Sequence, residues 1–330
     1  MTFEARDRLV ARASRAAVAF ADGFGALESG AAIALRPHEM VLEVGGADAA
    51  SYLHRMLTQD LQRLERGRGA HACLLDVRGR VLGDLRVWHR VSGLWVTGAA
   101  GSEVTARPVL ERYVIADDVT FRDRSADHVR LVLAGPQARA ALSALGIVPP
   151  ELGHMAGAEG VAWMATSQGD TEAFEGLGTL ESVERLLERM DDEALAAVVG
   201  GGAVEAWRVL HRVPRLGAEL GPERLFNEAG PDDAVSWTKG CYPGQEPVVM
   251  ARHRGKPPHR LVALVLRGTA VDDLPAPGAA LARQGRTVGS LSSVAALPDG
   301  RVVALGFVRT AEPEDAVDFD LPGGATAHVR

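Results

Sequence analysis

The last quarter of the chain has a different pattern from everything before it, and this pattern limits the folds that the chain can adopt. After Pro257-Pro258, short apolar segments are separated by turns that contain proline and glycine, and no stretch has the apolar spacing of a helix. Such a pattern is typical of strands, which we predict at residues 261–266, 287–294 and 302–308. This tail of about 70 residues is predicted to form a small antiparallel barrel or sandwich.

The part of the chain before Pro257-Pro258 mixes strand and helix patterns without a regular βαβ alternation. Strands are predicted at residues 40–44, 70–75, 81–88, 94–97 and 129–133. Helices are predicted at residues 107–115, 138–145 and 204–213, and a helical pair at residues 181–199, with a restart at Asp191-Asp192 and a stop at Gly200-Gly201-Gly202. This irregular order favours an α+β fold over a doubly wound parallel sheet.

Composition and charge exclude several classes of protein. Of the 330 residues, 47% are hydrophobic and 24% are charged, which is typical of a folded globular protein with two or three domains. The formal net charge of −7 offers no general attraction to a phosphate backbone, so no direct nucleic-acid partner is expected. No run reaches the roughly 18 apolar residues of a membrane span, and residues 1–20 lack the apolar core of a signal peptide. We therefore expect a cytoplasmic protein with no membrane partner, in which Cys73 and Cys241 are free thiols.

The octapeptide Lys239-Gly240-Cys241-Tyr242-Pro243-Gly244-Gln245-Glu246 contains one of only two lysines and one of only two cysteines in the chain. The other lysine is Lys256, and every other cation of the Lys and Arg total is an arginine. An ammonium is a compact point charge that titrates when buried, whereas a guanidinium is a bulky planar fork. A lysine at this position therefore indicates that an arginine could not take over its role there.

The octapeptide is predicted to form a tight exposed turn rather than a helix, because two glycines flank its proline. A strand is predicted just before it, at residues 235–237. Cys241 would then be accessible, and the cations Lys239, Arg252 and Arg254 would lower the pKa of its thiol. A thiolate of this kind is a nucleophile or a transient metal ligand. The alternative is a small residue that fills a turn, whereas Cys73, in an apolar strand, is interpreted as a core residue.

Glu205 allows two interpretations. It lies three residues before Arg208 in a predicted helix, so the two side chains can form a surface ion pair. Alternatively, its carboxylate accepts hydrogen bonds from a ligand with paired N–H donors, such as a pterin ring. The step Thr58-Gln59-Asp60 is interpreted as a helix N-cap.

Common nucleotide and metal motifs are missing from the sequence. There is no Gly-x-x-x-x-Gly-Lys-Ser/Thr, and no Gly-x-Gly-x-x-Gly follows a strand. The ten histidines and two cysteines show no His-x-x-x-His or Cys-x-x-Cys spacing. Neither nucleotide binding nor a mononuclear metal site is therefore predicted.

The octapeptide resembles the Lys-Gly-Cys-Tyr-x-Gly-Gln-Glu signature of the YgfZ-type folate-binding proteins, which are relatives of the glycine-cleavage T-protein, an aminomethyltransferase. Weaker motifs follow in the same order as in that family, at residues 44–49, 57–60, 74–81, 84–87, 135–136, 205–208 and 214–217. The resemblance implies a three-part α+β fold around a central folate cleft, with a C-terminal antiparallel β-barrel. We accordingly expect a folate-binding core at residues 1–258 and the barrel at residues 259–330.

The resemblance also implies roles for individual residues. Glu205 matches the glutamate that holds the pterin of tetrahydrofolate, Cys241 matches the cysteine on which activity depends, and Lys239 supports that cysteine. Further contacts to the cofactor are expected from the rest of the loop and the segment after it, namely Tyr242, Gly244, Gln245, Glu246 and Arg254. Two departures from the family pattern, Pro243 and Pro247, are expected to affect the geometry of the loop.

Two functions are compatible with this resemblance. The first is a folate-binding factor that supports the assembly or repair of iron–sulfur enzymes, including tRNA-modifying ones, with those enzymes as protein partners. The second is a tetrahydrofolate-dependent aminomethyl or one-carbon transferase of the T-protein type. The catalytic aspartate of T-proteins is expected within residues 96–103, where Glu103 is the only acidic residue. A proton-transferring carboxylate must lie within hydrogen-bond reach, so this difference favours the first function and leaves open whether the protein is an enzyme.

Overall fold

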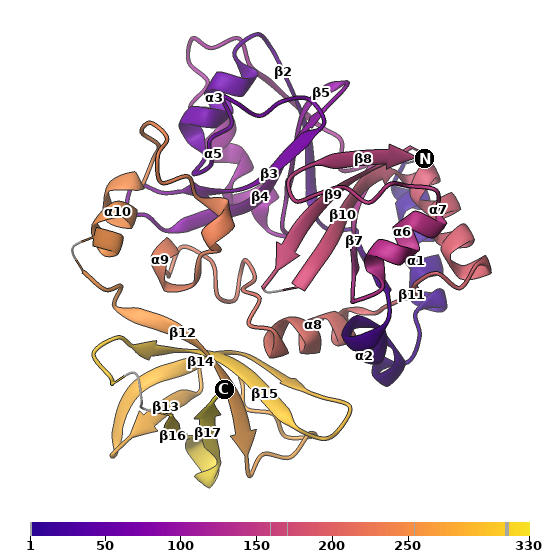
Figure 1. Ribbon diagram of the computed structural model, residues 1–330. Coiled ribbons are helices and arrows are strands. Elements are labelled where there is room, and N and C mark those ends of the chain that lie inside the picture. Colours follow the sequence, from indigo (N-terminus) through magenta and orange to yellow (C-terminus); the bar gives the residue numbers. More distant parts are fainter. Residues whose placement is uncertain (1, 159, 170, 254, 314–316) are drawn as a thin grey trace.

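The computed structural model describes residues 2–158, 160–169, 171–253, 255–313 and 317–330. The strands of this part of the chain form two open sheets and one closed barrel. In Figure 1 the barrel lies below the two sheets, with helix α8 (Gly201–Leu210) beside it. The predicted α+β class is confirmed.

The first sheet is antiparallel and has the strand order β3-β4-β5-β2-β6. Its strands are β2 (Met40–Gly45), β3 (Arg68–Leu75), β4 (Val81–Arg90), β5 (Gly93–Gly98) and β6 (Thr120–Asp123). The associated helices are α3 (Ala49–Met56), α4 (Ser102–Thr105) and α5 (Arg107–Arg112). Tyr52 and Leu53 of α3 and Leu110 of α5 pack on the apolar side chains of one face. The predicted hairpin of β3 and β4 is present, and its turn is the contact surface for the octapeptide described below.

The second sheet has the order β11-β1-β7-β10-β9-β8, with a single parallel pair, β11 and β1. Its strands are β1 (Ala32–Arg36), β7 (His128–Ala134), β8 (Met155–Ala158), β9 (Val161–Gln168), β10 (Thr171–Thr179) and β11 (Ala197–Val198). Alternate residues serve opposite faces. Leu131 and Leu133 pack with helices α1 (Thr2–Ala16), α6 (Ala138–Ala144) and α7 (Leu180–Asp192). Val132 packs with α2 (Phe20–Ser29) and α8.

The C-terminal strands close into an antiparallel barrel in the order β12-β15-β14-β13-β16-β17, as predicted. They are β12 (His259–Arg267), β13 (Ala280–Arg283), β14 (Arg286–Ala296), β15 (Val302–Arg309), β16 (Asp318–Asp320) and β17 (Thr326–Val329), with the 3-10 helix η2 (Pro322–Gly324) before β17. The division of the chain into separate domains at residue 258 stays a prediction.

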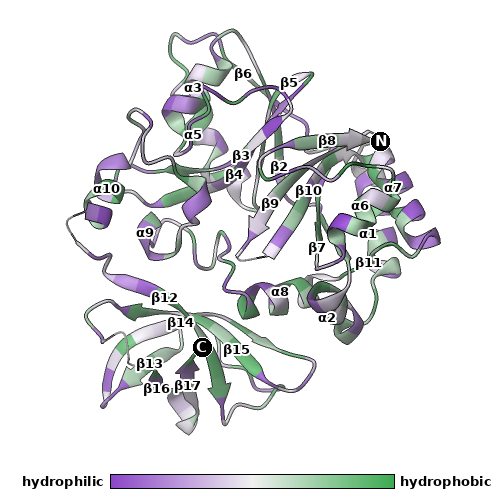
Figure 2. Ribbon diagram, in the orientation of Figure 1, coloured by the Kyte–Doolittle hydropathy of each residue, from purple (hydrophilic) through white to green (hydrophobic). Residues whose placement is uncertain are grey.

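Strand β15 attaches the barrel to the core. Figure 2 shows this strand as largely hydrophobic, and residues 302–308 are buried on both faces. Ala304 and Val308 pack inside the barrel. Leu305 and Phe307 point outward and join a second cluster with Val209 and other residues of α8. The barrel therefore packs directly on the helix that carries Glu205.

A buried ion-pair network ties α8, the following loop and the barrel together. Glu219, which has no exposed surface, accepts hydrogen bonds from Arg208 Nη1 (3.0 Å), Ser292 Oγ (2.8 Å) and Ser293 Oγ (2.6 Å). Arg208 also donates to Ser293 Oγ at 2.6 Å. Because buried charges are stable only when paired, this network fixes Arg208 relative to the barrel.

A row of charged side chains runs between the two sheets. One part of the interface is apolar, where Trp88 and Trp95 pack with Met164 and Leu177. Beside it lies a continuous chain of hydrogen bonds that we call the polar seam; its members are Asp233, His71, Asp84, Arg86, Glu175, Arg130 and Glu39.

Glu175 is the central residue of the polar seam and is fully buried. Its carboxylate accepts from Arg86 Nε at 2.9 Å, across the interface between the sheets, and from Arg130 Nη1. Burial alone would raise the pKa of Glu175, but Arg130 and Arg86 hold that pKa below its ordinary value. One carboxylate thus pairs with two buried cations that come from different sheets.

Three segments differ from the predictions. Residues 235–237 are not a strand; Ser236 N donates to the carbonyl of Thr58, a loop contact. Helix α7 ends at Asp192, where the break was predicted, but residues 193–199 form no second helix; Ala194 has a positive φ of 51° and β11 follows. Gly201 and Gly202 begin α8 instead of ending a helix, because Gly200 is extended and serves as the N-cap.

Among the described residues, no helix has both the length and the apolar composition that are needed to cross a membrane.

Glu175→Gln is predicted to lower the free energy of unfolding by about 3 to 5 kcal/mol, because Arg86 and Arg130 would remain buried with one carboxylate fewer. The control is Glu172→Gln on the same strand, whose pair with Arg139 is exposed and is expected to contribute about 1 kcal/mol or less. Urea unfolding of both variants measures the difference. Equal destabilisation by the two substitutions would contradict the structural role of the polar seam.

Candidate functional site

The octapeptide forms a loop that turns at Pro243 and Gly244 and then enters a helix. Gln245 N donates to Tyr242 O at 3.2 Å, and Gly244 has a φ of 79°, which is the pattern of a type II turn with proline at its second position. Gln245 and Glu246 already belong to helix α10 (Gln245–His253), so the prediction of a turn through Glu246 is wrong. Pro247 lies in the first turn of α10, where a missing N–H costs little. Both prolines fit the loop.

Gly244 is packed against the turn of the β3–β4 hairpin. A Cβ atom at this position would lie 2.3 Å from the carbonyl oxygen of Asp76 and 3.1 Å from the Cα atom of Gly79. The backbone also adopts the left-handed region, which favours glycine. The close approach therefore holds the loop to the hairpin and explains why glycine is required here.

Cys241 is exposed, as predicted, and the next residue is buried. The ring of Tyr242 lies in an apolar cluster with Cys73, Phe226 and Val248. Burial raises the pKa of Tyr242 to about 12. The family resemblance implied that Tyr242 contacts the cofactor. In the structure its ring packs beneath the loop and anchors the loop to the core. The buried ring of Tyr242 thus fixes the backbone that carries the exposed thiol of Cys241.

Lys239 anchors the other side of the loop. Its Nζ donates to three backbone carbonyls, those of His54, Leu57 (2.5 Å) and Gln59 (3.1 Å), at the end of helix α3. A compact ammonium has three donors that can reach converging acceptors, whereas a planar guanidinium cannot adopt this arrangement. A cation is also favourable at the C-terminal end of a helix. This geometry explains the rare lysine.

The predicted role of Lys239 in activating Cys241 is not what the structure shows. Its ammonium is directed at α3, and burial lowers its pKa to about 8, with Asp60 opposing that shift. Arg252, the second expected neighbour, stacks on the ring of Trp237, with 3.8 Å between the guanidinium carbon and the ring centroid. Arg254, the third, lies outside the described residues.

Thr58 is a link between segments and not a helix cap. Its side chain is fully buried; Oγ1 donates to the carbonyl of Ala234 at 2.5 Å and accepts from Cys73 N at 2.8 Å. Gln59 Nε2 donates to the carbonyl of Asp233 at 2.7 Å. Together these bonds join the segment before the octapeptide to strand β3.

Glu205 forms the expected pair with Arg208, but that pair is not a surface feature. Arg208 donates to both carboxylate oxygens, from Nε at 2.7 Å and from Nη2 at 2.5 Å, and is itself buried. The Glu205 side chain is 37% exposed. Burial alone would raise the pKa of Glu205, but Arg208, Arg215 and Arg36 lower it. Glu205 is therefore an ionised and partly accessible acceptor.

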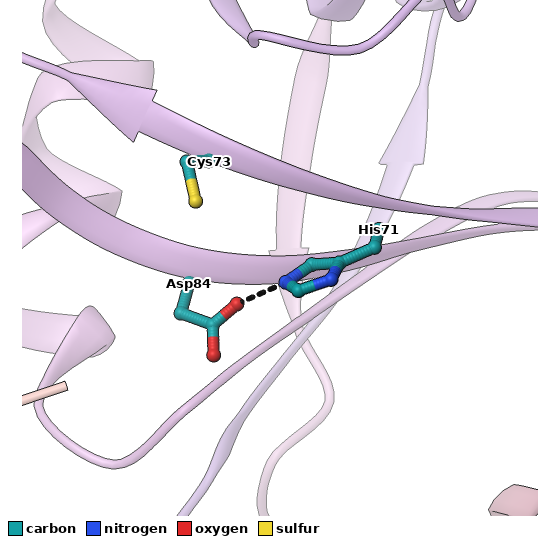
Figure 3. A group of neighbouring side chains, drawn as sticks. All are labelled: His71, Cys73 and Asp84. Atoms are coloured by element: carbon teal, nitrogen blue, oxygen red, sulfur yellow. Dashed lines mark hydrogen bonds and ion pairs between the residues drawn. The ribbon is translucent and has the colours of Figure 1, made fainter. Parts of the chain in front are cut away.

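His71, Cys73 and Asp84 form a group that the sequence did not predict (Figure 3). His71 and Cys73 are alternate residues of β3, and Asp84 lies opposite Cys73 on β4. One ligand atom of each lies within 4.8 Å of those of the others. Imidazole, thiolate and carboxylate are all zinc ligands. A search for short spacings misses this group because one member comes from the neighbouring strand.

The ligand atoms of His71 and Asp84 are already engaged in hydrogen bonds. His71 Nε2 lies 2.5 Å from Asp84 Oδ1 and its Nδ1 lies 3.0 Å from Asp233 Oδ1, while Arg86 donates to the same Asp84 oxygen. Burial and Arg86 oppose protonation of His71, but the two carboxylates raise its pKa above the ordinary value. Burial raises the pKa of Cys73 well above its ordinary value. A metal ion would have to displace the bonds of His71 and Asp84, so these two residues act as part of the polar seam and Cys73 lies beside them.

The polar seam connects the two predicted functional regions. Asp233, at one end, precedes the octapeptide. Glu39, at the other end, raises the pKa of Arg36, and Glu205 does so as well. Two open hollows, of about 350 and 530 Å³, are lined by residues 60–69 with Gly153 and by residues 185–193. Neither is lined by Glu205 or Cys241, so the central folate cleft stays a prediction.

The depressed pKa of Lys239 predicts a specific pH dependence of stability. The unfolded chain retains the lysine proton to about pH 10.5, and the folded protein to about pH 8. Stability should therefore rise between these values, by on the order of 3 kcal/mol, relative to Lys239→Met. Unfolding by urea at several pH values measures this difference.

The matched control for this experiment is Lys256→Met, which removes the other lysine, an exposed one. Its stability should follow that of the unmodified protein across the same range. Parallel pH profiles of Lys239→Met and the unmodified protein would show that Lys239 titrates normally.

Residues 14–162 match the family model of the GCVT N-terminal domain. The chain is 26% identical over 306 residues to an aminomethyltransferase of Desulfitobacterium hafniense, covering 87% of this chain and 82% of that protein. It is also 26% identical over 269 residues to the tRNA-modifying protein YgfZ of Cronobacter sakazakii, covering 79% of each.

The fold matches that of aminomethyltransferase T from the glycine cleavage system of Bartonella henselae. The TM-score is 0.78 at 21% identity, and the match covers 94% of this chain and 87% of the other. The identity is too low for this match to show more than a shared fold. The chain thus contains a region that matches the GCVT N-terminal domain, has the fold of a glycine-cleavage aminomethyltransferase, and is similar in sequence to both aminomethyltransferases and YgfZ proteins.

Proposed function

We propose that this protein binds tetrahydrofolate and supports the assembly or repair of iron–sulfur enzymes through the thiol of Cys241. The observation that carries this proposal is the presentation of that cysteine. Cys241 is exposed, whereas Lys239 and Tyr242 on either side are buried and hold the loop to α3 and to the core. A cysteine with only a packing role is expected among apolar side chains, as Cys73 is.

An exposed thiol on a fixed loop suits a reaction with a macromolecular partner. Thiolates bind iron and attack electrophilic sulfur or carbon. In this proposal the iron or cluster is cargo that belongs to the client enzyme, and Cys241 is a transient ligand or a nucleophile. Gln245 and Glu246 follow Cys241 after the turn, at the start of α10, and are proposed to contact the bound ligand or the client.

Glu205 is proposed to hold the pterin ring. A carboxylate has about four acceptor positions, and the fork of Arg208 uses one on each oxygen. The 37% exposure of the side chain leaves the remaining positions accessible to a ligand. A pterin offers adjacent 2-amino and N3–H donors, so the donor set fits the carboxylate. When bound, tetrahydrofolate supplies a carrier for one-carbon units.

The proposed partners are iron–sulfur client proteins in the cytoplasm. A relative carries the name tRNA-modifying protein, and this supports the proposal that a tRNA-modifying enzyme is among the clients. Direct binding of tRNA is not part of the proposal, since the formal net charge of −7 would oppose it.

Aminomethyl transfer from a folate is the second candidate function, and the similarity to an aminomethyltransferase favours it. The argument against this candidate is that the segment expected to carry the proton-transferring aspartate contains no aspartate. Glu103, the acidic residue of segment 96–103, accepts a hydrogen bond from Gly101 N at 3.0 Å at the exposed start of α4. Measurable exchange of glycine carbon with a lipoyl carrier protein would establish this candidate instead.

The primary proposal predicts that two substitutions have separate effects. Glu205→Ala should weaken binding of tetrahydrofolate at least about tenfold, because the charged hydrogen bonds to the pterin are lost. Cys241→Ala should bind folate normally but fail to restore iron–sulfur enzyme activity in a deficient cell. Calorimetric titration and the cellular assay measure the two effects.

Glu103→Ala is the control for both assays, since its carboxylate bonds only within its own turn. It should behave as the unmodified protein does. Unchanged folate binding in Glu205→Ala would overturn the pterin assignment, and full restoration by Cys241→Ala would overturn the role of the thiol.

A further inference from the structure

Arg36 is a cation without a protein partner in the described part of the chain. It is the last residue of β1 and is paired in register with Arg130 of β7. Arg130 is committed to Glu39 and Glu175. No hydrogen bond or ion pair joins the Arg36 side chain to another described residue, although it is only partly exposed. Its five N–H donors are therefore available.

An arginine of this kind is costly for the folded protein. A partly buried guanidinium is stable when a carboxylate or another acceptor satisfies it, and a second cation beside it adds repulsion. Burial lowers the pKa of Arg36 even though the carboxylates of Glu39, Glu175 and Glu205 oppose that shift. A group that destabilises the fold and satisfies no protein atom is typical of a site that receives a ligand.

Arg36 lies near Glu205 without touching it. Ala32 and Ala34, the alternate residues of β1 on the same side as Arg36, pack in one cluster with Ala203 of α8. Glu205 follows two residues later on that helix. The charge of each side chain influences the other, yet no ion pair joins them. A donor and an acceptor are thus held near each other, and their polar atoms are not bonded to one another.

We propose that Arg36 is a second ligand-binding residue of the Glu205 site and donates to the 4-oxo oxygen of the pterin ring. This inference rests on the proposed folate function. In a pterin the 4-oxo oxygen is adjacent to the N3–H and 2-amino donors, so one edge of the ring presents two donors and then an acceptor. Glu205 accepts from the donors, and Arg36 satisfies the acceptor. The pair then selects a 4-oxo over a 4-amino ring.

The test is Arg36→Met, with binding and stability measured on the same full-length protein. Binding of tetrahydrofolate should weaken about 10- to 100-fold, the range expected for loss of one charged hydrogen bond. The midpoint of thermal unfolding without ligand should stay the same or rise, because no protein contact is lost. A structural role would give the opposite result, a lower midpoint.

Two further variants sharpen this test. Arg36→Lys retains a charged donor and should recover part of the lost affinity, whereas Arg122→Met removes an arginine whose side chain is 74% exposed and should leave affinity unchanged. Tetrahydroaminopterin carries a 4-amino group in place of the oxygen. The affinity ratio between tetrahydrofolate and this analogue should fall in Arg36→Met.

The outcomes separate this inference from the folate proposal. Tetrahydrofolate affinity within about twofold of the unmodified value in Arg36→Met, or a lower unfolding midpoint, would overturn the role of Arg36. Absence of tetrahydrofolate binding by the unmodified protein, or normal binding by Glu205→Ala, would instead overturn the folate site itself.

Discussion

The buried carboxylate of Glu175 joins the two sheets of the core, and the arrangement of the functional groups depends on it. Through Arg86 it reaches the β3–β4 hairpin, and through Arg130 it reaches the strand beside Arg36. With His71 protonated, the polar seam contains four carboxylates and three cations. Such a network is stable only in one arrangement of the sheets, and this specificity orders the surface that carries the octapeptide.

The octapeptide and Glu205 are fixed by different parts of this framework. Lys239 ties the loop to the end of α3, and Gly244 seats it on the hairpin turn. Arg208 orients Glu205 and is itself held by Glu219 and by serines of the barrel. The barrel therefore has a direct physical role at the proposed folate site, because it positions the arginine that positions the carboxylate.

Strand periodicity in the sequence was sufficient to predict the barrel and most strands of the first sheet. The exposed Cys241 and the Glu205–Arg208 pair also followed from local spacing. The polar seam could not be predicted from local spacing, because its hydrogen bonds join residues that are far apart in the chain, such as Arg86 and Glu175. Glu175, a charged residue within the otherwise apolar residues 173–177, was the available signal. The hydrogen bonds of Lys239 could not be predicted either, because every residue has a backbone carbonyl and the sequence does not show which of them accept.

The central claim is that Glu205 and Arg36 together hold the pterin ring beside α8. A crystal structure of the protein with tetrahydrofolate tests it most directly. The account predicts the 2-amino and N3–H groups within hydrogen-bond distance of Glu205 and the 4-oxo oxygen within reach of Arg36, while Arg208 keeps its bonds to Glu205 and Glu219. A pterin ring bound elsewhere, or one that leaves Glu205 in contact with Arg208 alone, would contradict it.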